Sequence, residues 1–82
     1  MALPRVRLSD LPEGASATFD EADVDPSTRR MLGSLGFTAS CQLRLCKTGE
    51  PFIVRVRTTR IGLSKALAGA IYVIPRATNG SA

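Results

Sequence analysis

The chain has 82 residues, 44% of them apolar and 22% charged, so it can form one small folded domain and is not intrinsically disordered. Its net charge is +4 and it contains no histidine. The absence of histidine excludes the Ser-His-Asp and Cys-His arrangements of many hydrolases, and we expect a protein that is not an enzyme and needs no cofactor.

Charge is divided unequally along the chain. Residues 1–28 carry two arginines against six acidic residues, whereas residues 29–82 carry nine Lys or Arg against one Glu. The basic part indicates an acidic protein, nucleic acid or a membrane surface as partner, or alternatively a dipolar domain whose charges only maintain solubility. No apolar run is typical of a secretory signal or a membrane span, so a cytoplasmic location is expected.

The first predicted elements are a turn-rich entry and a short strand. In residues 8–14, Leu8 and Leu11 are free to pack inward. Residues 15–19 predict the strand, and the acidic residues 20–25 predict a solvated loop after it.

A helix is predicted next. Asp25 is a favoured N-cap and Pro26 suits the first helical position. Gly36 ends the helix where a left-handed residue is favoured, and Phe37 follows where a hydrophobic contact is typical. A buried stripe at helical spacing is formed by Met31, Leu32 and Leu35.

Alternating apolar residues predict the remaining strands. Residues 41–46 and 52–57 alternate with period two and flank a hairpin turn at 47–51. A short strand around 61–63, a helical turn at 64–68 and an apolar strand at 70–74 complete the series. The residues expected to be buried are Leu32, Leu35, Leu43, Leu45, Val54, Val56, Leu63, Ile71 and Val73.

These elements predict a mainly β fold: a small five-stranded barrel, with one α-helix between the first two strands and a short helical turn before the last. A closed barrel is favoured over an open sheet because closure removes unpaired edges. The domain is expected to span residues 8–75, with loose termini at 1–7 and 76–82.

The ordered set of motifs resembles the FeoA family. It comprises Leu8, Leu11 and Gly14; residues 29–37 (Arg-Arg-Met-Leu-Gly-Ser-Leu-Gly-Phe); the hairpin 49–57; and residues 60–63 with Ala68, Ile71 and Val73. The resemblance implies an SH3-like barrel, an association with transition metal ions and ferrous iron transport, and a role beside FeoB, a membrane transporter with a cytoplasmic GTPase domain. Three positions depart from the family pattern: Ala39-Ser40, Thr58 and Ser64.

No metal site is predicted within one chain. Cys41 and Cys46 are five residues apart in one predicted strand, so they point to opposite faces with Cα atoms roughly 16 Å apart. That separation excludes both a disulfide and shared chelation of one ion. The acidic residues 20–25 lack the glycine and the distal glutamate of a calcium loop.

The best candidate for a functional surface is basic. Arg55, Arg57 and Ile53 share the outer face of one predicted strand, with Arg60 close by, and adjacent guanidinium groups bind carboxylates or phosphates well. A solvated barrel face is the structural alternative. The leading prediction is a module that docks on and modulates a FeoB-like partner, and a homo-oligomer is a further potential assembly. The alternative is a small basic barrel that binds nucleic acid. This alternative is less favoured because few aromatic side chains point outward to stack on bases.

Overall fold

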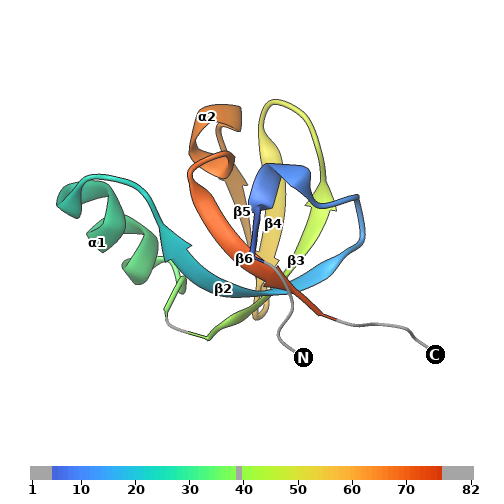
Figure 1. Cartoon of the computed structure of the whole chain (residues 1–82), viewed down its shortest axis with the longest axis horizontal. Coiled ribbons are helices and arrows are strands. Elements are labelled where there is room, and N and C mark those ends of the chain that lie inside the picture. Colours follow the sequence, from blue (N-terminus) through green and yellow to red (C-terminus); the bar gives the residue numbers. More distant parts are fainter. Residues whose placement is uncertain (1–4, 39, 77–82) are drawn as a thin grey trace.

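The computed structural model describes residues 5–38 and 40–76, which form a single antiparallel sheet with short helices at its margins (Figure 1). The strand order is β1-β6-β2-β3-β4-β5. The elements are β1 (Val6–Arg7), the 3-10 helix η1 (Leu8–Asp10), β2 (Ser16–Ala22), α1 (Pro26–Ser34), β3 (Gln42–Lys47), β4 (Phe52–Val56), β5 (Thr59–Leu63), α2 (Lys65–Ala68) and β6 (Ile71–Pro75).

The mainly β, SH3-like class is confirmed, but two details differ from the prediction. The described residues contain six strands, because Val6–Arg7 pairs with β6 instead of forming part of a loose start. The sheet curls around its core, but within the described ranges β5 pairs with β4 alone, so the strand pairing does not close into a ring. The predictions for residues 1–4 and 77–82 lie outside the described residues.

Strand β2 is longer than predicted and includes part of the expected acidic loop. Asp20 and Glu21 belong to this strand, which is irregular between Phe19 and Glu21 where it pairs with β6. Both carboxylates face Arg5, whose Nη1 lies 2.9 Å from Asp20 Oδ2 and 3.3 Å from Glu21 Oε1. This acidic segment is a strand because it pairs with β6 and because Arg5, which is distant in the sequence, forms ion pairs with its carboxylates.

Helix α1 begins and ends as predicted. The Asp25 carboxylate accepts hydrogen bonds from the Thr28 N–H at 3.2 Å and the Thr28 hydroxyl at 2.6 Å. At the other end Gly36 has φ +111°, and the Phe37 N–H donates to the Leu32 carbonyl at 3.0 Å, which is the Schellman arrangement. Phe37 is buried and packs edge-to-face against Phe19.

The predicted buried stripe of α1 is correct for only one of its three residues. Leu32 is 1% exposed, whereas Met31 and Leu35 are 46% and 38% exposed. The helix stands at the side of the curled sheet instead of lying across it, so a single apolar position reaches the core (Figure 1). The prediction that Leu35 is buried was wrong for this reason.

The core contains all the other residues predicted to be buried. Leu8 and Leu11 also pack inward, because η1 closes over one end of the sheet. The core is composed of Leu8, Leu11, Ala17, Ala22, Leu32, Phe37, Leu43, Leu45, Phe52, Val54, Val56, Ile61, Leu63, Ala68, Ile71 and Val73.

The short helix α2 is held at both its cap and its first turn. The Ser64 hydroxyl accepts from the Leu67 N–H at 3.1 Å, and Glu50 Oε1 accepts from the Lys65 N–H at 2.7 Å. Ser64 is one of the departures from the family pattern, and its role as an N-cap explains a small polar residue there.

Candidate functional site

Strand β4 directs its one polar side chain, that of Arg55, outward, as the alternation predicted. Phe52, Val54 and Val56 are buried, while Arg55 is exposed and Ile53 half-buried. A shift of the register by one residue would bury a guanidinium, so the apolar residues fix the orientation of Arg55.

Arg57 and Arg60 occupy different places in the β4–β5 hairpin. Arg57 follows the end of β4 and takes a left-handed conformation, φ 61°, in the turn it forms with Thr58. It therefore does not continue the face of the strand as predicted. Arg60 lies on β5 directly opposite Arg55.

The strand registers assemble these residues into a longer row. Arg44 on β3 is directly opposite Arg55, and Ser16 on β2 is directly opposite Arg44. Just beyond β6, the Arg76 N–H donates to the Ser16 carbonyl at 3.0 Å, which brings Arg76 to the same level of the sheet. We call the residues Arg60, Arg55, Arg44 and Arg76 the arginine row.

Sequence reasoning missed Arg44 and Arg76. The outward orientation of Arg44 is readable from its place between Leu43 and Leu45. The hairpin predicted at 47–51 pairs the two strands, but the sequence does not predict the register that places Arg44 opposite Arg55. The predicted loose terminus, residues 76–82, includes Arg76.

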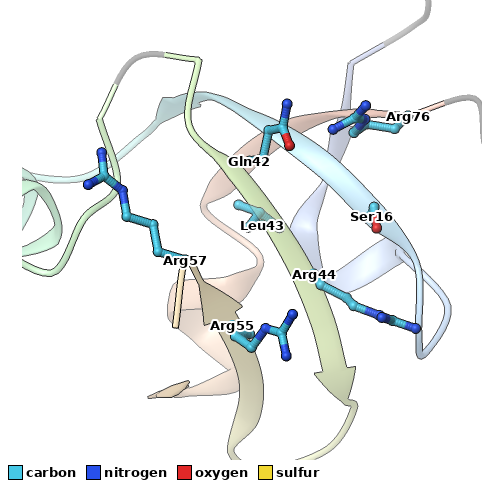
Figure 2. Close-up of a pocket in the computed structure, with 7 residues that line it drawn as sticks. All are labelled: Ser16, Gln42, Leu43, Arg44, Arg55, Arg57 and Arg76. Carbon is cyan, nitrogen blue, oxygen red and sulfur yellow. The ribbon is translucent and has the colours of Figure 1, made fainter. Parts of the chain in front are cut away.

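A shallow cavity of about 260 Å³ lies between these side chains; we call it the basic cavity (Figure 2). In Figure 2 the guanidinium groups of Arg44 and Arg55 extend in similar directions, that of Arg76 points toward Gln42, and that of Arg57 points away from the others. The lining residues are Ser16, Gln42, Leu43, Arg44, Arg55, Arg57 and Arg76.

Acidic side chains do not neutralise the arginine row. All seven carboxylate side chains of the sequence lie in residues 5–38 and 40–76, and the only ion pairs there are those of Arg5 with Asp20 and Glu21. Like charges directly opposite one another on neighbouring strands are destabilising. The outer face of β3, β4 and β5 therefore carries positive charge that is available to an external anion.

Two other acidic residues serve the fold. The Thr48 N–H and hydroxyl donate to Glu13 Oε2 at 3.0 and 3.1 Å, and the backbone hydrogen bond is the main cause of a lowered pKa of Glu13. The pKa of Asp25 is likewise lowered, chiefly by the Thr28 hydroxyl and then by the Thr28 N–H. Glu13 thus joins the segment before β2 to the loop after β3, and Asp25 caps α1.

The described part of the chain contains no group of three or more Cys, Asp and Glu side chains close enough to hold a metal ion. Cys41 and Cys46 are both free thiols, and the Cys46 thiol contacts the Arg44 carbonyl at 3.8 Å. The chemistry that the arrangement offers is binding of anions by guanidinium groups.

A model of the FeoA domain family matches residues 6–75. The chain belongs to the FeoA domain family. Of the predicted departures from the family pattern, Ala39 lies outside the described residues, Ser40 takes a left-handed φ of 65°, and Thr58 forms the β4–β5 turn with Arg57.

Solved structures of FeoA proteins share the fold of this FeoA domain. An iron uptake regulatory protein (FeoA) is 26% identical with a TM-score of 0.81, over 90% of this chain and all of the other. FeoA of Stenotrophomonas maltophilia, solved in complex with zinc, is 31% identical with a TM-score of 0.73, over 83% of this chain and 88% of the other. FeoA of Chlorobium tepidum gives a TM-score of 0.84 at 24% identity, over 93% of this chain and 75% of the other.

A manganese-dependent transcriptional repressor has the same fold in part of its chain: at 22% identity and a TM-score of 0.81, the match covers 93% of this FeoA domain but 44% of the repressor. No curated protein matches the sequence. Within residues 5–38 and 40–76, no helix is long and apolar enough to cross a membrane.

Proposed function

We propose that this FeoA domain is a non-enzymatic accessory module of ferrous iron transport, which docks on an acidic surface of a FeoB-like transporter in the cytoplasm and modulates it. Family membership supports the association with ferrous iron transport. The Stenotrophomonas maltophilia neighbour is described as possibly acting as a bacterial ferrous iron transport activating factor.

The observation that carries the docking proposal is the unneutralised charge on the outer face of β4 and β5. Arg55, Arg57 and Arg60 are exposed, and no acidic side chain of the chain pairs with them in the described residues. Ile53 is half-buried on the same face and supplies apolar area beside the charges. A partner with carboxylates at matching positions gains charge-assisted hydrogen bonds without displacing an internal ion pair.

The test is a binding titration between this chain and the cytoplasmic domain of a FeoB-like transporter. Arg55→Glu combined with Arg57→Glu should weaken binding by about 30-fold or more, which corresponds to about 2 kcal/mol. The fold should survive, because an acidic side chain at position 55 would face Arg44 and Arg60 and pair favourably with both.

The matched control makes the same change of charge elsewhere, at Arg30→Glu on α1 and Lys65→Glu on α2. Both side chains are exposed and neither lines the basic cavity. Equal losses in the two double variants, with unchanged melting curves, would mean that only net charge matters and would refute docking through β4 and β5. Size-exclusion chromatography of the same samples measures any homo-oligomer.

A further inference from the structure

We propose that the basic cavity is a binding site for a chain of two or more phosphate groups. This inference does not rest on docking to a transporter. It begins from the opposition of Arg44 and Arg55 on adjacent strands, with Arg76 on the other side of Ser16. Such an array of like charges on neighbouring strands lowers stability unless an anion lies between them.

The donors that line the cavity suit phosphate oxygens. Each guanidinium carries five N–H donors in a planar fork, and the Ser16 hydroxyl and the Gln42 amide add neutral donors. No acidic side chain lines the cavity. Guanidinium groups bind phosphate through two parallel hydrogen bonds, so several arginines around one hollow can contact several phosphate oxygens at once.

The amount of charge favours a phosphate chain over a single carboxylate. Four arginines line the cavity, Arg44, Arg55, Arg57 and Arg76, and the guanidinium group of Arg57 points away from the other three (Figure 2). A triphosphate carries about four negative charges at pH 7, since each phosphate group contributes roughly one to two. One carboxylate would leave most of the positive charge uncompensated.

The size and walls of the cavity indicate that only the phosphates are recognised. Its volume of about 260 Å³ lies just below the roughly 300–1,000 Å³ typical of pockets for drug-sized ligands. Its lining contains no aromatic residue on which a base could stack. The nucleoside of a nucleotide would therefore extend outside, and the site should not distinguish one base from another.

The proposed phosphate site is tested by calorimetric titration of the whole chain at low and moderate salt. The ligands are sodium triphosphate, pyrophosphate, orthophosphate and citrate. Citrate is the control ligand, because it carries about three charges on carboxylates alone. Triphosphate should bind at least tenfold more tightly than orthophosphate or citrate, and ATP and GTP should match triphosphate within about threefold. Citrate binding as tightly as triphosphate, or no saturable binding of triphosphate, would overturn the inference.

Variants then locate the site. Arg44→Gln with Arg76→Gln should weaken triphosphate binding at least tenfold, as expected when charge-assisted hydrogen bonds are removed. The control Arg30→Gln with Lys65→Gln removes equal charge away from the cavity and should change binding less than threefold. Equal losses in both would show attraction to the overall field and refute the site; a melting curve of each variant verifies the fold.

The two proposals fail separately. Arg44 and Arg76 lie outside the residues proposed for docking, so their replacement tests phosphate binding alone. If triphosphate does not bind while Arg55→Glu with Arg57→Glu still abolishes partner binding, the phosphate site is wrong and docking stands. If triphosphate binds and Arg55→Glu with Arg57→Glu leaves partner binding unchanged, the docking proposal is wrong and the phosphate site stands.

Discussion

Replacing Arg55 with threonine removes the central charge of the arginine row, and we expect this to stabilise the free protein. Arg55 is directly opposite Arg44 on one side and Arg60 on the other. At a separation of roughly 7 Å, two like charges in water repel each other by about 0.6 kcal/mol, which is comparable with the energies of cross-strand pairs. Arg55→Thr should therefore increase the free energy of unfolding by about 1.2 kcal/mol at low ionic strength.

The measurement is thermal unfolding followed by circular dichroism at about 10 mM and about 1 M salt. A gain of about 1.2 kcal/mol corresponds to a rise in Tm of roughly 5–10 °C for a domain of this size. Arg60→Thr, which places the same residue type on β5, removes only one opposed pair and should give about half the gain. The Debye length falls to about 3 Å at 1 M salt, so the difference between the two variants should nearly vanish there. A lower Tm for Arg55→Thr at low salt, or a rise in Tm that does not depend on salt, would show that the guanidinium groups of the arginine row do not destabilise the fold by mutual repulsion.

Two further predictions concern the fold. Gly36→Ala should lower the free energy of unfolding by about 1–3 kcal/mol in denaturant titrations, because Gly36 has φ +111° and an added Cβ would lie 3.1 Å from Val56 Cγ1. Gly33→Ala, in the helix and with nothing within 4 Å of the added Cβ, should instead be neutral or stabilising, and a similar loss at both positions would refute the role of the helix end. The free energy of unfolding should also fall on acidification below about pH 4, because folding lowers the pKa values of Glu13 and Asp25. The two carboxylates stabilise the fold fully above their pKa values in the unfolded chain, and this stabilisation is lost as each becomes protonated. In pH-dependent melting curves, Glu13→Gln with Asp25→Asn should make this fall shallower; an unchanged slope would contradict it.

The signals that predicted the fold correctly are local. Asp25 and Gly36 mark the ends of α1 because capping depends on backbone groups within a few residues. Alternation around Leu43, Val54 and their neighbours fixes which side chains face the core, since successive residues in a strand point to opposite faces. The outward orientation of Arg55 follows from the same parity, so part of the candidate site was readable from the sequence.

Long-range pairing decided the remainder. Asp20 and Glu21 extend β2 because β6 and Arg5 meet them there, and Met31 and Leu35 stay exposed because α1 stands at the side of the sheet. The sequence by itself determined which residues of β3 and β4 face solvent. Only the tertiary structure decided that Arg44, Arg55, Arg60 and Arg76 share one level of the sheet, because registers between strands depend on how separate segments pair, and no period within one strand encodes that.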